Sequence, residues 1–219
     1  MPTQNKLSRR DFLQAAGATL GVSVLACGGL GVLATRAPEI NLMENQYKRA
    51  NDMRKVLVAY ASKAGSTGEV AEAIGQVLNA KGMTVDVRQV KNVKDVSGYQ
   101  AFVIGSAIRM GRWLPEATKF LEAHKSELSQ SPTAIFTVCL TLSEDNEKNR
   151  REVEGYMQPV RAILEPVSLG LFGGRLDLGK LSFIERFIMA NLIKAREGDF
   201  RNWDAIRSWA GELAPRLII

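Results

Sequence analysis

The sequence has little histidine and little cysteine, and both shortages limit the chemistry that it can carry. Among its 219 residues there is one histidine, His124, and there are two cysteines, Cys27 and Cys139, far apart in unlike contexts. A single histidine excludes a multi-histidine metal centre, and two distant cysteines provide neither a disulfide framework nor a cysteine metal site. The sequence therefore predicts no metal site.

The chain also lacks the strong positive charge that is typical of nucleic-acid-binding proteins. Its formal net charge is +6 at pH 7, and about half of that charge arises in residues 1–36, so the remainder is too weakly basic to indicate a nucleic-acid partner. With 46% hydrophobic and 24% charged residues, the composition is that of an ordinary globular protein. The length fits one domain plus a targeting segment.

No charged residue occurs between Phe12 and Thr35, and this run directly follows Ser8-Arg9-Arg10-Asp11. An arginine pair before a moderately hydrophobic run matches the twin-arginine export signal. We therefore expect residues 1–36 to form a signal or membrane-anchor helix, residues 37–52 a linker, and residues 53–219 the folded domain. The twin-arginine pathway exports folded proteins, which indicates a cofactor inserted before export.

Three fates of this segment are open. Val32-Leu33-Ala34 is compatible with signal cleavage, whereas an uncleaved run of 24 uncharged residues would span roughly 36 Å, enough to cross a bilayer core of about 30 Å. Val24-Leu25-Ala26-Cys27 resembles a lipoprotein box less well. Because basic residues precede the apolar run, each fate predicts a domain on the extracytoplasmic side of the cytoplasmic membrane, anchored or released.

From Met53 onward, strand-like apolar runs alternate with helical patterns. The alternation within 85–90 indicates an edge strand with one exposed face, and Pro159 is expected to disturb its helix. Five strands alternating with helices predict a doubly wound α/β fold, a five-stranded parallel sheet with helices on both faces and ligands beyond the carboxyl ends of its strands. The expected strands are 55–60, 85–90, 101–105, 133–138 and 167–172, and the expected helices are 67–81, 115–128, 147–164 and 203–213.

The turn after the first expected strand has the composition of a phosphate-binding loop. Ser62-Lys63-Ala64-Gly65-Ser66-Thr67 places hydroxyl groups and a glycine where backbone N–H groups and the helix dipole attract an anion. It has neither the Gly-Lys-Ser/Thr ending of a Walker loop nor the Gly-x-Gly-x-x-Gly fingerprint, which disfavours nucleoside triphosphates and NAD. An ordinary helix cap is the alternative. In its spacing the loop resembles the FMN phosphate loop of flavodoxins.

A flavodoxin-like sheet would present its flavin at the ends of the first, third and fourth strands. The third strand leads into a glycine-bounded loop, in which Gly105 would let the flavin ring approach the backbone and Trp113 would stack on the ring or pack nearby. Cys139 is expected to be a small buried residue rather than a redox thiol. The residues expected to contact FMN in these two loops are Gly105, Ser106, Ala107, Ile108, Arg109, Gly111 and Trp113, and then Cys139, Leu140 and Thr141.

Longer stretches carry a closer resemblance. Gly105-Ser106-Ala107-Ile108-Arg109-Met110-Gly111, Phe172-Gly173-Gly174-Arg175-Leu176 and Phe183-Ile184-Glu185-Arg186-Phe187-Ile188-Met189 together resemble the flavodoxin-type menaquinone-dependent protoporphyrinogen dehydrogenase family. The resemblance covers about residues 55–213 and implies FMN at the three loops, with electrons passing from protoporphyrinogen to a quinone. Members of that family act at the cytoplasmic side of the membrane, whereas this chain carries an export signal. The export signal therefore argues against the porphyrin substrate more than against the flavin.

Residues 178–199 form an insertion before the closing helix, and their pattern is amphipathic. One face carries the apolar residues Phe183, Phe187, Ile188, Leu192 and Ile193, next to Glu185, Arg186, Lys194 and Arg196. This face is suited to rest on lipid or to admit a quinone. Packing on the sheet, or on a second subunit in a homo-oligomer, is the alternative.

The leading hypothesis is an exported or membrane-anchored FMN-dependent oxidoreductase that takes electrons from a small organic donor and passes them to a quinone. The flavin would carry the chemistry, and Arg109 is the one side chain with a candidate catalytic role, through donor carboxylates or the electron-rich edge of the ring. The alternative is a membrane-tethered flavodoxin that carries electrons between redox partner proteins. Its mild positive charge disfavours that alternative, because such carriers are usually acidic. A flavodoxin fold without flavin, serving as a binding module, is a third hypothesis.

Overall fold

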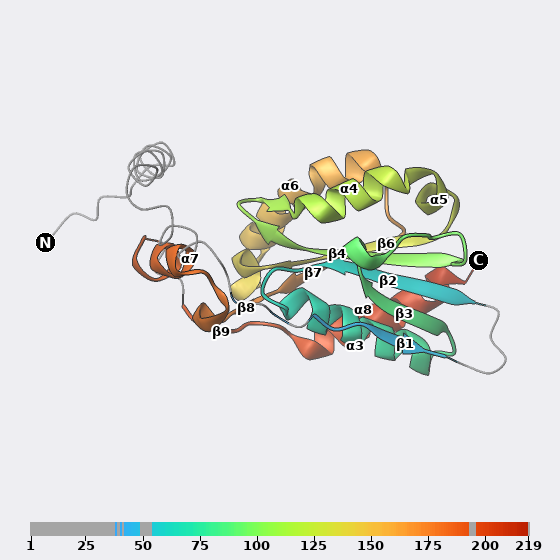
Figure 1. The fold of residues 1–219 in the computed structure, drawn as a ribbon, viewed down its shortest axis with the longest axis horizontal. Coiled ribbons are helices and arrows are strands. Elements are labelled where there is room, and N and C mark those ends of the chain that lie inside the picture. Colours follow the sequence, from blue (N-terminus) through green and yellow to red (C-terminus); the bar gives the residue numbers. More distant parts are fainter. Residues whose placement is uncertain (1–37, 39, 41, 49–53, 193–195, 219) are drawn as a thin grey trace, which may run out of the picture. The chain divides into compact units, whose positions relative to one another are not determined.

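The computed structural model describes residues 38, 40, 42–48, 54–192 and 196–218 (Figure 1). The chain divides into two units, a main domain of Glu39–Leu178 with Arg196–Ile219 and a second unit of Met1–Pro38 with Gly179–Ala195. The predicted signal or anchor within residues 1–36 lies outside the described residues. Among the residues that are described, no helix combines the length and hydropathy that a membrane span requires.

The main domain is built on the predicted parallel sheet. In the described part of the chain, five parallel strands lie in the order β3-β2-β4-β6-β7, which is a doubly wound order. Each of these strands is rich in buried apolar residues because helices cover both faces of the sheet. The strands are β2 (Lys55–Ala61), β3 (Thr84–Gln89), β4 (Ala101–Arg109), β6 (Thr133–Cys139) and β7 (Leu169–Gly173).

Helices cover the two faces of the sheet as predicted. Figure 1 shows α3 (Ser66–Ala80) and α8 (Trp203–Leu213) on one face, and α4 (Pro115–Ala123), α5 (Lys125–Gln130) and α6 (Glu147–Ile163) on the other. The single helix expected over 115–128 is divided at His124, whose backbone is not helical.

Pro159, expected to disturb its helix, lies inside an unbroken α6. Because proline has no N–H, the carbonyl of Gly155 lacks its helical hydrogen-bond donor. Gly155 lies on the exposed side of the helix, where water can donate to this carbonyl instead.

The prediction that the strand at 85–90 lies at the edge of the sheet is wrong. The short strand β1 (Asn45–Tyr47) pairs antiparallel with β3, with Asn45 opposite Val87 and Tyr47 opposite Val85, so it covers that edge. The segment predicted as a linker, 37–52, therefore contributes to the sheet. A strand of three residues is too short to produce a recognisable period in the sequence.

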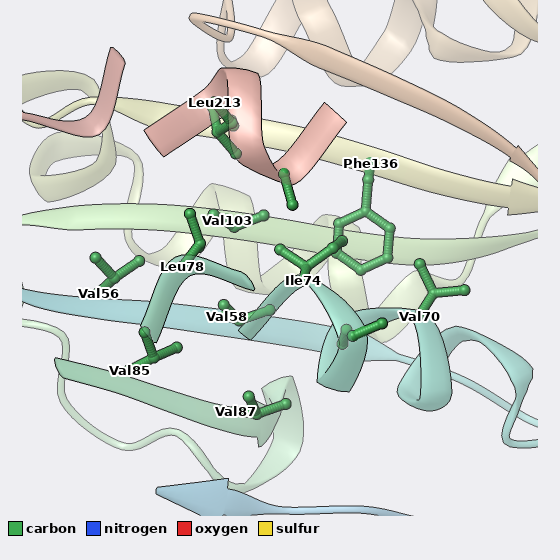
Figure 2. Close-up of a cluster of buried hydrophobic side chains, with 14 of the residues drawn as sticks. Val56, Val58, Val70, Ile74, Leu78, Val85, Val87, Val103, Phe136 and Leu213 are labelled. Atoms are coloured by element: carbon green, nitrogen blue, oxygen red, sulfur yellow. The ribbon is translucent and has the colours of Figure 1, made fainter. Parts of the chain in front are cut away.

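Two core layers hold the helices to the sheet. Figure 2 shows Val58, Ile74, Leu78 and Phe136 in the layer between the sheet and α3 with α8, where these side chains are fully buried. Residues next to them along the strands, such as Leu57 beside Val58, face the opposite layer under α4 and α6. Alternation along each strand therefore supplies both layers at once.

Gly105 is required by this packing. A Cβ atom built on Gly105 would lie 2.0 Å from Cζ of Phe136, so the ring of Phe136 occupies the space that any side chain would need. The sequence predicted instead that Gly105 leaves room for a flavin ring. The observed neighbour is a core residue on the next strand, and the glycine serves the packing of β4 against β6.

Asp86 forms a buried polar cluster inside the sheet edge. Its carboxylate lies 2.9 Å from Nζ of Lys55 and accepts a 2.7 Å hydrogen bond from the Tyr99 hydroxyl. Burial raises the pKa of the Asp86 carboxyl, but the hydrogen bonds from Tyr99 and Lys55 outweigh burial and hold that pKa below its ordinary value. The folded state is therefore more stable with this carboxyl ionised than with it protonated.

The second unit contains the predicted amphipathic segment, but not as one helix. Ser182 and Glu185 form a capping box in which each side chain accepts a hydrogen bond from the other residue's backbone N–H, and α7 (Phe183–Phe187) begins there. A π-helical turn, η4 (Ile188–Leu192), follows. Phe183, Ile184 and Phe187 are 69%, 45% and 55% exposed. Residues 193–195 of the predicted face lie outside the described residues.

Replacing Gly105 with alanine should destabilise the fold. Because the added methyl group meets Phe136, we expect Gly105→Ala to lower the free energy of unfolding by about 1–3 kcal/mol, measured by urea denaturation. Gly98→Ala is the matched control, since a Cβ there meets nothing within 4 Å. Adding Phe136→Leu to Gly105→Ala should recover part of the loss, and equal stabilities for the two alanine variants would contradict this packing argument.

Asp86 should make the free energy of unfolding depend on pH in the acidic range. Because its pKa is lowered in the folded state, its contribution is complete above the unfolded-state pKa of about 4 and is lost as the pH falls through the lower folded-state pKa. We expect Asp86→Asn to cost about 1–3 kcal/mol at pH 7, and the difference from the original chain to shrink below about pH 4. Urea denaturation at several pH values measures both effects. Glu122→Gln, on an exposed position, should leave the pH profile unchanged.

Candidate functional site

The candidate site lies where the carboxyl ends of the central parallel strands meet. Three loops follow these ends, namely 62–65 after β2, the turn at Met110 and Gly111 after β4, and the turn η2 (Leu140–Ser143) after β6. The paired register of these strands brings their carboxyl ends to one edge of the sheet. This is the edge at which doubly wound folds bind their ligands, as the sequence analysis predicted.

The loop after β2 is shaped by Gly65. This residue caps α3 with a φ of 89°, in the left-handed region that glycine adopts without strain. Its N–H donates a 3.0 Å hydrogen bond to Oγ of Ser62, and its carbonyl accepts from the N–H groups of Gly68 and Glu69. The Ser62 side chain therefore closes the loop, and no side chain caps the helix.

The start of α3 leaves polar groups without partners. Within the described residues, the N–H groups of Ser66 and Thr67 donate to no protein acceptor, and the buried Oγ1 of Thr67 has no hydrogen-bond partner. Buried polar groups are nearly always paired, so a buried hydroxyl without a partner beside free helix amides indicates a ligand that accepts hydrogen bonds. At the positive end of a 15-residue helix, that ligand is an anion such as a phosphate.

Lys63 and Ala64 take different places in this loop. The Nζ of Lys63 lies 3.3 Å from a carboxylate oxygen of Glu116 on α4, with both side chains partly exposed. Ala64 is half-buried. The structure therefore pairs Lys63 with α4, and a contact of either residue with the cofactor stays a prediction.

The loop expected between Gly105 and Trp113 is a β-hairpin. Strand β4 continues to Arg109 and pairs with β5 (Arg112–Trp113), and the turn between them consists of Met110 and Gly111. Both turn residues have positive φ, 51° and 72°, as a tight hairpin turn requires. Methionine is unusual at the first of these positions, where asparagine, aspartate or glycine is typical, and this hid the turn in the sequence.

Three residues expected to contact the cofactor from this hairpin are buried instead. Ser106 is completely buried, and its Oγ accepts a 3.1 Å hydrogen bond from the N–H of Leu114. Gly105 is covered by Phe136, and Trp113 is 5% exposed within the core layer under α4. These residues support the hairpin from within, because the strand extends further than predicted. Ala107, Ile108, Arg109 and Gly111 retain accessible surface.

The loop after β6 begins at a buried thiol. Cys139 is 5% exposed, and its Sγ accepts a 3.4 Å hydrogen bond from the N–H of Thr141. Burial raises the pKa of the Cys139 thiol, which keeps it protonated and unreactive near neutral pH. The sequence predicted this burial. Leu140 and Thr141 are partly exposed and can face a ligand.

Tyr156 on α6 links the two loops, and the sequence analysis did not identify it. A Cβ on Gly111 would lie 3.1 Å from Cε1 of Tyr156, and the ring packs against the cluster that contains Cys139 and Leu142. Its hydroxyl donates a hydrogen bond to the carboxylate of Glu152. Burial, together with Glu152, raises the pKa of Tyr156 to about 12. The spacing of Glu152 and Tyr156, four residues apart on a helix, was the available signal.

Arg201 is a second residue that sequence reasoning missed. Its side chain is 2% exposed and forms ion pairs with Glu69 at 2.7 Å and Asp199 at 2.6 Å, while its guanidinium lies 4.4 Å from the ring centre of Trp203. Burial lowers the pKa of Arg201, but the bonds with Asp199 and Glu69 outweigh it, so the net direction is upward. Arg201 thereby fixes the first turn of α3, where Glu69 lies, to the chain that precedes α8.

Comparison with known proteins agrees with this geometry. A family model described as "Flavodoxin domain" matches residues 57–202. The chain is 25% identical over 178 residues to the protoporphyrinogen IX dehydrogenase [quinone] of Leishmania major, covering 75% of this chain and 77% of that protein. It is 23% identical over 172 residues to the enzyme of the same name from Escherichia coli K12, covering 73% and 94%.

Solved structures include an archaeal flavodoxin, 19% identical, with a TM-score of 0.44, covering 74% of this chain and 98% of the other. The family match includes all three loops at the carboxyl ends of β2, β4 and β6. The unpartnered hydroxyl of Thr67 and the free amides of α3 fit the phosphate group of FMN, the cofactor of flavodoxin domains. The chain therefore belongs to the flavodoxin domain family.

Proposed function

We propose that this protein is an FMN-dependent oxidoreductase that takes electrons from a porphyrinogen-like donor and passes them to a quinone. The observation that carries the proposal is the phosphate cradle at the start of α3, with its unpartnered Thr67 hydroxyl. The names of two distant relatives, both quinone-dependent protoporphyrinogen IX dehydrogenases, support the choice of donor and acceptor.

The residues of the cradle would hold the cofactor through its phosphate group. The N–H groups of Ser66 and Thr67 and the buried Thr67 hydroxyl would donate to the phosphate, and the left-handed backbone of Gly65 forms the turn that leads into this first turn of α3. Bound FMN supplies the capacity to accept and release electrons, so the protein need not provide a redox-active side chain. The buried and protonated thiol of Cys139 agrees with this division of roles.

The hairpin supplies the surface for the donor. Arg109 and Arg112 flank the turn on paired positions and are both exposed. Porphyrinogens carry carboxylate side chains, and a guanidinium is suited to bind a carboxylate through two hydrogen bonds. We assign Arg109 to donor binding rather than to proton transfer. We assign no role to His124, which ends α4 and whose ring contacts Phe120 in a tilted arrangement, with 4.7 Å between the ring centres.

The proposal includes an extracytoplasmic location. The arginine pair at positions 9 and 10 and the uncharged run of residues 12–35 support export by the twin-arginine pathway, with the domain anchored to or released from the membrane. The exposed apolar side chains of α7 support contact with the lipid phase in which quinones dissolve.

Thr67→Val should separate cofactor binding from stability. Valine has the shape of threonine without the hydroxyl, so we expect FMN to bind about 10–100-fold more weakly because a hydrogen bond to a charged group is lost. The flavin-free protein should be as stable as before or slightly more stable, since the hydroxyl has no partner there. Quenching of FMN fluorescence gives the affinity, and thermal unfolding gives the stability.

Thr118→Val, on α4, is the matched control and should leave FMN affinity unchanged. An unchanged affinity in Thr67→Val would contradict the cradle. If the purified protein binds no FMN at all, the proposed function fails.

Arg109→Ala should weaken binding of the donor more than binding of the quinone. The assay follows the fluorescence of protoporphyrin formed from protoporphyrinogen with a menaquinone analogue. We expect the donor KM to rise about 10-fold with kcat little changed, because a carboxylate contact made equally before and during reaction is lost. Arg151→Ala, on the exposed surface of α6, should have no effect. A rate with the holo-protein no higher than the uncatalysed background would exclude this donor.

A further inference from the structure

The N-terminal segment joins the main domain at the edge that carries the candidate site. Since β1 runs antiparallel to β3, residues before Asn45 lie beside the carboxyl end of β3. Two contacts fix them there. The Tyr60 hydroxyl donates a 2.5 Å hydrogen bond to the carbonyl of Met43, and the Glu44 carboxylate accepts a 3.0 Å bond from the N–H of Gln89, the last residue of β3. Residues 42–44, which connect the N-terminal segment to β1, therefore lie at this edge.

A second segment leaves the domain at the same edge. Strand β7 ends at Gly173 opposite Cys139, and it leads directly into β8 (Arg175–Leu176), which pairs with β9 (Gly198–Asp199). Residues 179–196, called the arm below, lie between these two short strands. Arg201, just beyond β9, is bonded to Asp199 and to Glu69 in the first turn of α3. Both ends of the arm are thus attached beside the phosphate loop.

Most of the exposed large apolar side chains belong to these two segments and to the hairpin. In the described part of the chain, seven large hydrophobic residues are exposed, and five of them belong to this edge or to the arm that leaves it, namely Met43, Met110, Phe183, Ile184 and Phe187. Met110, at the tip of the hairpin, is 88% exposed. The other two, Val167 and Ile218, lie at the opposite edge, where Val167 bonds to the first residue of β6 and to Arg216.

We propose that the edge carrying the phosphate loop and the hairpin is a docking surface for an anionic phospholipid bilayer. This inference rests on the proposed function and deepens it, because it brings the flavin site to the phase that holds the quinone. A bilayer is the partner that the N-terminal part of the chain, outside the described residues, favours. Residues 12–35 contain no charge and, as a helix, are long enough to cross a bilayer, and they lead to this edge.

The connection is short. Thr35 and Met43 are eight residues apart, which is at most about 30 Å of extended chain, less than the roughly 40 Å diameter of a domain of this size. An anchored chain therefore holds this edge, rather than the opposite one, next to the membrane. The arm adds charge, since it contains four basic residues and one acidic residue, and basic residues are attracted to an anionic membrane surface.

Lipid-attached quenchers test the orientation directly. The full chain with Cys27→Ser would carry an environment-sensitive fluorophore on Met110→Cys or on Val167→Cys, and be reconstituted into vesicles of phosphatidylcholine and phosphatidylglycerol. Buried Cys139 is not accessible to the label. Headgroup-attached nitroxide should quench the probe at position 110 several-fold more than the probe at 167. Equal quenching, or stronger quenching at 167, would overturn the proposal.

A pair of double variants tests the arm. Phe183→Ser with Phe187→Ser should reduce quenching of the probe at 110, whereas Val167→Ser with Ile218→Ser, which changes exposed apolar residues at the opposite edge, should not. Vesicles of phosphatidylcholine alone should also reduce it, because they remove the attraction for the basic arm. Unchanged quenching under both conditions would show that the arm does not contribute to membrane binding.

Turnover with a water-soluble quinone analogue in detergent separates this proposal from the proposed function, because that reaction needs no bilayer. Turnover together with equal quenching at the two positions would overturn the orientation alone. Stronger quenching at position 110 without any turnover would overturn the quinone function and leave the docking surface intact.

Discussion

The start of α3 is the constraint around which the candidate site is organised. The chain turns from β2 into this helix without a capping side chain, so it leaves amides and the Thr67 hydroxyl unpaired inside a packed domain. Such groups are costly unless a ligand binds them. The surrounding structure maintains this arrangement through the positive φ of Gly65 and the hydrogen bond from Gly65 to Ser62. Arg201, from the C-terminal part of the chain, forms an ion pair with Glu69 in the same helical turn.

Features encoded locally could be predicted from the sequence. The five parallel strands, the helices on both faces and the phosphate loop each depend on residues close together in the chain. Ser62 and Gly65, for instance, belong to one turn and signal it by composition alone. The burial of Cys139 was likewise visible, because the residue ends an apolar run.

Features that depend on distant partners could not be predicted. The sequence predicted that Gly105 leaves room for a flavin ring, but that room is filled by Phe136, which is 31 residues later in the chain. Arg201 and Glu69 are 132 residues apart, and nothing in either local sequence announces the ion pair. The hairpin was hidden for a different reason, since Met110 adopts a backbone conformation that methionine rarely takes. Tyr156 was overlooked because its partners lie on two other loops.

The short strand β1 has a consequence for how the chain behaves before and after any shortening of its N-terminus. It occupies the hydrogen-bonding groups on the outer side of β3, which would otherwise be open to another molecule. A chain cut within residues 42–48 would expose the backbone hydrogen-bonding groups along the outer side of β3 and would leave the buried hydroxyl of Tyr60 without its acceptor at Met43. The same few residues that connect the domain to its N-terminal segment therefore also protect it from self-association and aggregation.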